Sequence, residues 1–429
     1  MTSVAEIERR TPEGRDRYAD FLRALSIVVV VAGHWLAAVV WLRDGRFGGT
    51  NALEVVPGLW ALTWVLQVMP LFFFVGGFAN ARGIASTRRR GGTVGDFVGA
   101  RLRRLLRPTV AFVAVWVPLG AILTIALDGA AATTVGRLAA VPLWFLGVYA
   151  AVIAVAPVML RLHERFGVRV VVVLAAAAAA VDVVRIATGA PDSPIALLNW
   201  ITVWLFAHQL GFFYADGSLA RIPRPAFAAG AVAALGALAA LVSTGVYSPS
   251  MVGMDDGKLS NNNPPSVCMV LMTLWLVSAA MLARPTVRRW LDRPRPWAAV
   301  VRLNTVIMTV YLWHLTAMAI GIAIALPFGW PHGRPPGTAE WWALRPAWLL
   351  LHALVLVPLV RTFARFETRP DPSVGTPTAA ALGGAAAASA GTAGLALGGM
   401  SFAGAGATGP LAPALLVVAG AALVRGRRR

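Results

Sequence analysis

The chain has 429 residues, of which 58% are hydrophobic and only 13% charged, and its formal net charge is +19. Mean hydropathy is +0.70, which excludes an ordinary soluble domain and is typical of a protein that crosses a membrane many times. The basic charge could suggest a nucleic-acid partner, but it falls between the apolar runs, so we expect a lipid-bilayer partner and no nucleic acid.

Apolar runs long enough to cross the roughly 30 Å hydrocarbon core recur along most of the chain. They predict an all-α, polytopic membrane bundle of about ten helices, with one or two further weak spans left open at the C-terminus. The predicted spans are about 21–42, 58–80, 108–127, 142–160, 168–187, 198–214, 225–246, 266–283, 300–326 and 343–360.

Arginine is distributed unevenly between the loops. One side carries most of it, including Arg88, Arg89 and Arg90, whereas the opposite loops hold few basic residues, such as Arg43 and Lys258. The positive-inside rule therefore predicts a multi-pass plasma-membrane protein with a cytoplasmic N-terminus. Tryptophans at the span edges are expected in the membrane interface: Trp290, Trp297, Trp341, Trp342 and Trp348.

The sequence divides into three parts. Residues 1–18 form a charged cytoplasmic segment, residues 19–365 form the transmembrane domain, and residues 366–429 form a tail rich in alanine and glycine. This tail is either a disordered linker or a weakly membrane-associated pair of extra spans. The single cysteine, Cys268, excludes an intramolecular disulfide framework and a cysteine-based zinc site.

The first predicted span carries three ionisable residues at suggestive spacing. Asp20, Arg23 and His34 are separated by 3 and 11 residues, and eleven residues make about three helical turns, so Arg23 and His34 share one face about 16 Å apart. An ionisable side chain within a span indicates a functional site. A neutral imidazole can act as a general base, and a guanidinium suits phosphate binding. The alternative is that His34 is a packed polar residue that bonds a neighbouring helix.

A basic segment precedes the third predicted span. Arg101, Arg104 and Arg107 lie among four arginines within seven positions, just before Pro108. Such a cluster can bind anionic lipid headgroups or the phosphates of a nucleotide. The alternative is that these arginines only set the topology of the chain.

The ninth predicted span contains Tyr311 and His314. His314 lies twelve residues from Arg302, which is nearly the separation between Arg23 and His34. Two histidines at similar depth on different helices could meet in one cavity, although His314 could equally be a packing residue.

Together these stretches resemble the acyltransferase-3 family of multi-spanning membrane O-acyltransferases, in a bacterial, stand-alone form without a fused esterase-like domain. Asp20, Arg23 and His34 match the D-x-x-R and R-x10-H pattern with which the family begins. The usual serine of its second-helix signature is replaced here by Gly76. The other matching stretches are residues 69–78, 101–108, 144–146 and 311–314.

The resemblance implies transfer of an acyl group from cytoplasmic acyl-CoA to a hydroxyl of a glycan, lipid-linked sugar or small molecule. The expected reaction is O-acetylation, with acetyl-CoA as the donor. His34 would be the catalytic base, and Asp20 would orient Arg23. His314 and Tyr311 would place the acceptor or stabilise the developing oxyanion. Arg23 and the basic segment would bind the phosphates of coenzyme A: Arg101, Arg104 and Arg107.

The expected co-substrate is acyl-CoA, with no permanently bound cofactor and no metal. A separate extracytoplasmic partner that handles the acyl group is left open.

A different class of function, a transporter or flippase that uses buried histidine and arginine as a proton or substrate pathway, is the main alternative. Against it, the sequence shows no inverted repeat. A non-catalytic scaffold would leave the first-span histidine unexplained.

Overall fold

The structure is a computed structural model that describes residues 3–43, 46–190, 193–254, 256–330, 334–368, 375–404 and 409–426. Almost all regular structure within these residues is helical. The elements are α1 (Val4–Arg9), α2 (Arg17–Ala37), β1 (Ala38–Arg43), β2 (Arg46–Asn51), α3 (Ala52–Val55), η1 (Leu59–Leu62), α4 (Thr63–Leu66), α5 (Met69–Arg89), α6 (Val94–Ala126), α7 (Gly129–Ala140), α8 (Leu143–Phe166), α9 (Val168–Ala187), η2 (Pro194–Leu198), α10 (Asn199–Ala215), η3 (Ser218–Arg221), α11 (Arg224–Ser243), α12 (Val267–Leu291), α13 (Pro294–Thr305), α14 (Ile307–Ala325), η4 (Leu326–Phe328), α15 (Ala339–Ala343), α16 (Arg345–Thr368), α17 (Thr378–Gly398) and α18 (Leu411–Leu423).

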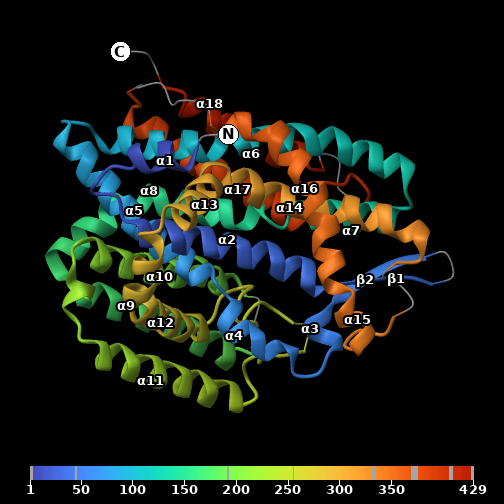
Figure 1. Ribbon diagram of the computed structural model, residues 1–429, viewed down its shortest axis with the longest axis horizontal. Helices are drawn as coiled ribbons and strands as arrows, with labels where there is room; N and C mark the ends of the chain where they lie inside the picture. The colour runs from blue at the N-terminus through green and yellow to red at the C-terminus, as the bar shows by residue number, and fades with distance from the viewer. Residues whose placement is uncertain are drawn as a thin grey trace. The chain divides into compact units, whose positions relative to one another are not determined.

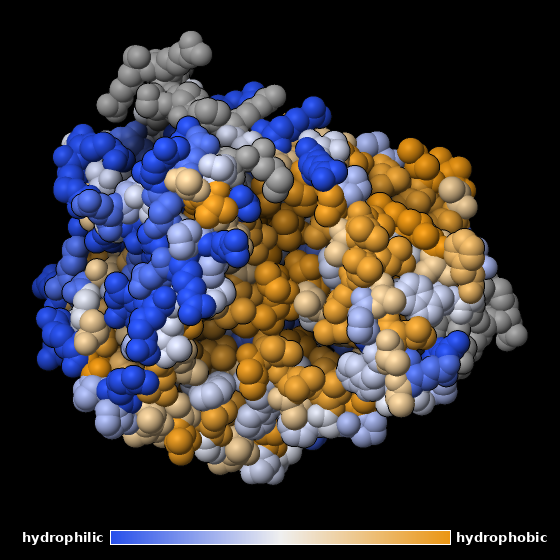
Figure 2. Space-filling view, in the orientation of Figure 1, coloured by the Kyte–Doolittle hydropathy of each residue, from blue (hydrophilic) through white to orange (hydrophobic). Residues whose placement is uncertain are grey.

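Eleven helical segments among the described residues are long and apolar enough to cross a membrane. Ten of them overlap the ten predicted spans, and the eleventh is α17, so the prediction of a polytopic helical bundle is confirmed. Large apolar side chains on these helices remain exposed, for example Val173 on α9 and Leu354 on α16. Figure 2 shows apolar residues over a wide part of the face it presents. Exposed apolar area on this scale is what a lipid-facing surface requires.

The chain folds as two compact units. The first comprises Met1–Val30, Pro57–Gly83 and Ala156–Thr305. In it α11 packs along α12, and α10 packs along α9 (Figure 1). The backbones of α5 and α10 touch at Gly77 and Gly211, where a Cβ on Gly77 would lie 1.9 Å from the carbonyl oxygen of His208. The glycine pair that the sequence shows at residues 76–77 thus lies at a close helix–helix contact.

The second unit comprises Val31–Val56, Ile84–Val155 and Val306–Arg429. In it α14 packs against α16, and α17 packs against both α18 and α6 (Figure 1). The sequence left the tail open between a disordered linker and a pair of spans, and within the described residues it is helical. Arg103 of α6 is buried beneath it and donates hydrogen bonds to Thr376 Oγ1 and to the Val424 carbonyl oxygen, at 2.8 and 2.9 Å.

The helix α2, which corresponds to the first predicted span, is shorter than the predicted range 21–42. It ends at Ala37, and the chain then turns into the antiparallel hairpin β1–β2, in which Ala38 pairs with Asn51 and Val40 with Gly49. Hydropathy cannot separate the two states, because Val39, Val40 and Trp41 are as apolar as the helix before them. β-branched and aromatic residues of this kind favour a strand.

Two further predicted boundaries are corrected by the structure. The predicted span 300–326 is divided at Val306 into α13 and α14. The helix of the third predicted span, α6, begins at Val94, fourteen residues before the predicted start at 108. The basic segment therefore lies inside this helix. Its N-terminus is fixed by a capping box between Thr93 and Asp96, and such reciprocal bonds satisfy two free backbone donors.

Candidate active site

The structure brings the two predicted histidines of the second unit into direct contact. His34 lies in the last turn of α2 and His314 lies within α14. Nδ1 of His34 is 2.9 Å from Nε2 of His314, and the rings stack with centroids 5.1 Å apart. His314 is fully buried, whereas His34 is half-buried. One imidazole is therefore enclosed, and the other remains partly accessible.

Hydrogen-bond polarity defines the tautomer of each ring. Nδ1 of His314 lies 2.5 Å from the carbonyl oxygen of Tyr311, and a carbonyl can only accept, so His314 carries its proton on Nδ1. In a neutral imidazole the other nitrogen then accepts, so His34 donates to it through its own Nδ1. Nε2 of His34 is left as a lone-pair nitrogen, with no hydrogen bond to it among the described residues. The network thus assigns the basic nitrogen of the pair to His34.

Two tryptophans beside the histidines connect α2, α14 and α16 through hydrogen bonds. Trp35 Nε1 donates to the His314 carbonyl oxygen at 2.9 Å, and Trp348 Nε1 donates to the Trp35 carbonyl oxygen at 2.8 Å. His352 packs against both indole rings, with centroids 5.5 and 4.2 Å away. Trp348 is 1% exposed, so its indole packs inside the protein. Its neighbour Trp342 does remain exposed.

The start of α14 is positioned by a carboxylate from α16. Glu367 accepts hydrogen bonds from the backbone nitrogens of Met308 and Thr309, at 3.1 and 2.8 Å, and from the Thr309 hydroxyl at 2.8 Å. These backbone nitrogens have no partner within the helix, and a negative charge at a helix N-terminus is stabilising. Glu367 therefore fixes the helix that carries His314.

Tyr311 takes part through its backbone and its ring. Its carbonyl oxygen orients His314, and its ring stacks on that of His314 at a centroid distance of 5.9 Å. The Tyr311 hydroxyl donates to the carbonyl oxygen of Pro142 at 2.9 Å. In this arrangement the hydroxyl proton of Tyr311 is therefore used in a hydrogen bond to the backbone.

Arg23 lies in a polar cluster of the first unit. Its Nη2 is 3.1 Å from a carboxylate oxygen of Asp20, as the spacing of these residues predicts, and its Nε donates to Asn304 Oδ1 at 2.6 Å. Asn304 is itself held by hydrogen bonds from its amide nitrogen to the carbonyl oxygens of Asp20 and Val300. About a quarter of the Arg23 side chain, 26%, remains exposed. The guanidinium is thus oriented from two sides and still accessible.

The basic segment does not act as one surface. Arg101, Arg104 and Arg107 follow each other at three-residue spacing along α6 and keep some exposure, whereas Arg103 turns inward to the tail. Arg101 lies over the ring of Phe97 at 5.8 Å. The three predicted arginines therefore lie on one stripe of α6 that keeps some exposure.

The supporting residues of the histidine pair were not predicted from the sequence. Glu367 and Trp35 were not singled out, and Trp348 was assigned to the interface. The weak signal was the recurrence of Trp and His at helical spacing in Trp348 and His352. Within the part of the chain that the structure describes, no group of three or more His, Cys, Asp or Glu side chains could hold a metal ion.

One protein family, described as an acyltransferase domain, matches residues 16–360. This range contains both histidines, the Arg23 cluster and the basic segment, and it ends before the two tail helices. No curated protein and no solved structure matches the chain. The match covers most of the chain.

Proposed function

The chain belongs to the acyltransferase-3 family, and from this premise we propose that it transfers an acyl group from acyl-CoA, with acetyl-CoA the expected donor, to a hydroxyl of a glycan, a lipid-linked sugar or a small molecule. It is a membrane acyltransferase. The observation that carries the proposal is the hydrogen bond between His34 and His314, which leaves a lone pair on His34 Nε2.

That lone pair is suited to general base catalysis. His34 Nε2 would take the proton of the acceptor hydroxyl as its oxygen attacks the thioester carbonyl. The imidazolium that forms keeps its Nδ1 proton bonded to His314, which supports the developing positive charge as the third member of a catalytic triad does. When the intermediate collapses, the carbon–sulfur bond breaks, and the coenzyme A thiolate takes the proton from His34.

The donor would lie along α2. Arg23 and His34 belong to this one uninterrupted helix, and eleven residues at 1.5 Å each place them about 16 Å apart on one face. Arg23, with Asp20 and Asn304 holding it, would bind the phosphates, and the flexible pantetheine arm would bring the thioester towards His34. From the family resemblance alone, we further propose that Arg101, Arg104 and Arg107 of the second unit contribute to binding of the donor phosphates.

We place the protein in a bacterial plasma membrane with a cytoplasmic N-terminus, where the donor would enter from the cytoplasm. The acceptor would then either reach the same site, or the acyl group would pass to a separate extracytoplasmic partner.

The decisive test is thiol release by the purified protein. In nanodiscs containing lipids extracted from the source cells, the wild type should release free coenzyme A from acetyl-CoA, whereas His34→Ala should lose about 100- to 10,000-fold of that rate, the usual contribution of a general base. His163→Gln, outside the pair, is the matched control and should retain activity. Wild-type turnover in a correctly folded His34→Ala protein would refute the assignment.

The same assay separates the transporter alternative. A transporter should move its substrate unmodified and release no thiol. Mass spectrometry of glycans, lipids and metabolites from cells with and without the gene should show a mass difference of one acyl unit if the proposal is right, and this difference identifies donor group and acceptor together.

A further inference from the structure

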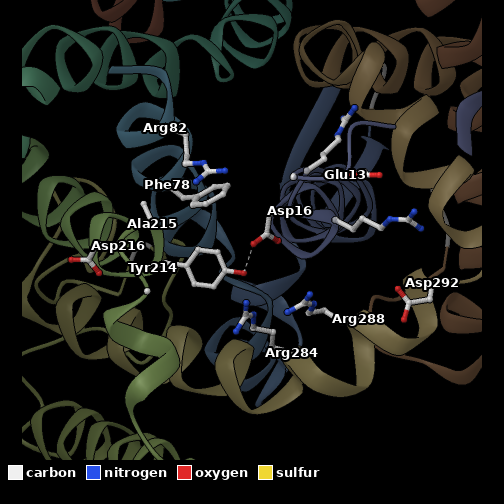
Figure 3. Close-up of a pocket in the computed structure, with 14 residues that line it drawn as sticks. Glu13, Asp16, Phe78, Arg82, Tyr214, Ala215, Asp216, Arg284, Arg288 and Asp292 are labelled. Carbon is white, nitrogen blue, oxygen red and sulfur yellow. Dashed lines mark hydrogen bonds between the residues drawn. The ribbon is translucent and has the colours of Figure 1, made fainter. Parts of the chain in front are cut away.

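The first unit contains a polar cavity of about 510 Å³ that the proposed acyl transfer does not use (Figure 3). It lies where the segment before α2 meets α5, α10 and α12, and its walls include Asp16, Arg82, Tyr214, Arg284 and Arg288. A volume of this size is within the range of small-molecule sites.

Most of the other charged groups around the cavity are already paired. Asp16 accepts hydrogen bonds from the Tyr214 hydroxyl and from the backbone nitrogen of Ala19, both at 2.9 Å. Arg17 forms an ion pair with Glu8 at 2.5 Å. A further ion pair joins Arg15 to Asp20 at 2.6 Å.

The Asp216 carboxylate is also engaged, and Figure 3 shows it turned away from Tyr214. Burial raises the pKa of this carboxyl, but hydrogen bonds from Ser218 and then from His163 outweigh burial and leave the pKa below its ordinary value. Asp216 therefore stays ionised at neutral pH and occupied by its own partners.

Among the described residues, two of the cavity arginines have no such partner, and a third, Arg284, contacts Tyr214 but keeps one unsatisfied donor. Arg82 of α5 and Arg288 of α12 are exposed, and neither has a hydrogen bond or ion pair among the described residues. Arg284 lies over the ring of Tyr214 at 5.2 Å, and its Nε is buried with no hydrogen-bond partner in the described part of the chain. A buried donor without an acceptor is costly and is usually satisfied by a ligand or water.

The placement of these arginines also favours the binding of an anion. Arg284 and Arg288 are four residues apart on α12, a spacing at which like charges on a helix repel each other. A phosphate between them would remove the repulsion and satisfy the buried Nε in one step, because guanidinium groups bind phosphate oxygens in pairs. Two carboxylates on the cavity wall, Glu13 and Asp292, can accept hydrogen bonds from hydroxyl groups of the same ligand.

We propose that this cavity binds a phosphate ester that also carries hydroxyl groups, held by Arg82, Arg284 and Arg288. Two sources share this chemistry: a soluble phosphorylated metabolite and the headgroup of an anionic lipid such as phosphatidylglycerol. Phe78 on the cavity wall offers an apolar contact to the rest of the ligand. The site does not depend on the identity of the acyl donor or on His34.

The test uses full-length protein and two matched probes. Glycerol 3-phosphate is titrated by calorimetry into protein in phosphatidylcholine nanodiscs. Phosphatidylglycerol retention is measured by native mass spectrometry of protein taken from mixed nanodiscs. The double variant R284Q/R288Q should weaken binding of at least one probe about tenfold or more, whereas R289Q/R293Q, which removes the same charge from the same part of the chain outside the cavity, should not. The probe that binds identifies the source.

The proposal is overturned if neither probe binds the wild type, or if R284Q/R288Q and R289Q/R293Q weaken binding equally. Should R284Q/R288Q fail to fold, R82Q gives the same comparison, because Arg82 is an exposed residue on a different helix. Unchanged affinity in R82Q would then count against the site.

Discussion

At the scale of single residues, hydrogen bonds determine that Nε2 of His34 carries the lone pair. The carbonyl oxygen of Tyr311 determines which nitrogen of His314 is protonated, and His314 in turn determines the same for His34. An isolated histidine would sample both tautomers, and only one of them leaves the lone pair on Nε2 of His34. His314 is therefore a positioning residue in the proposed chemistry, while His34 is the catalytic one.

Replacing His314 should separate these two roles. His314→Phe keeps a buried aromatic ring but removes the acceptor for His34 Nδ1, so we expect kcat to fall about tenfold or more, less than the 100-fold or greater loss for His34→Ala. The KM for acyl-CoA should not change. Because the residues act as one unit, the double variant His34→Ala/His314→Phe should be no slower than His34→Ala alone. Additive losses would show that the two histidines act independently.

Arg23 should affect donor binding rather than the chemical step. Arg23→Gln removes the charge while retaining a hydrogen-bonding group near Asn304, so the KM for acyl-CoA should rise at least tenfold, corresponding to about 1.4 kcal/mol, with kcat nearly unchanged at saturation. Arg302→Gln removes an exposed arginine of α13 and serves as the control. If the two variants have the same KM, Arg23 does not bind the donor.

At the scale of elements, the geometry of the histidine pair depends on hydrogen bonds between helices. The chain from Trp348 through Trp35 to the His314 backbone connects α16, α2 and α14. The Glu367 carboxylate fixes the start of α14. Both contacts act on backbone groups, so they set the positions of whole helices and through them the distance between the two imidazoles.

Trp348→Phe tests this connection. The substitution leaves an aromatic ring but deletes the Nε1 donor, so the Trp35 carbonyl loses its partner and unfolding free energy should fall by about 1–3 kcal/mol. Thermal unfolding measures this cost, and kcat should fall with it because the histidine contact loosens. Trp342→Phe, at an exposed indole of α15, is the control. An unchanged kcat in Trp348→Phe would show that the hydrogen bond stabilises the fold without positioning the pair.

At the scale of the whole molecule, the chain consists of the matched domain and an additional C-terminal pair of helices. α17 and α18 lie beyond residue 360, where the family match ends, and Arg103 and Asp96 of α6 hold Thr376 at the start of this segment. Glycines make the close packing possible, since a Cβ on Gly120 would lie 1.8 Å from the Met400 carbonyl oxygen. Contact with α6 gives structure to a low-complexity sequence.

The predicted orientation in the membrane can be tested by cysteine labelling. Native Cys268 is buried, so it should contribute little background. Arg9→Cys, at the N-terminus, should be protected from a membrane-impermeant maleimide in intact cells, whereas Lys258→Cys, in the loop before α12, should react. Both should react after permeabilisation. Labelling of Arg9→Cys in intact cells would reverse the orientation that the arginine distribution predicts.

Sequence patterns determined the features that are local along the chain. Hydropathy located ten spans because each helix buries its polar backbone within its own segment and needs only apolar length. The three-residue spacing of Asp20 and Arg23 predicted their ion pair, and the family resemblance drew attention to His34, Tyr311 and His314. Hydropathy did not reveal the hairpin after Ala37 or the break at Val306, because apolar residues of the same kind occupy both conformations.

Tertiary structure alone decided which side chains meet. The contact that assigns the lone pair to His34 joins residues 280 positions apart, and no local pattern encodes it. Arg103 and Arg104 are neighbours in one basic segment, yet one is buried beneath the tail and the other is exposed. In the same way, Arg284 lines a cavity while Arg289 does not. Hydropathy indicates where apolar spans form, because each helix satisfies its own backbone, but helix packing decides which polar side chains become partners.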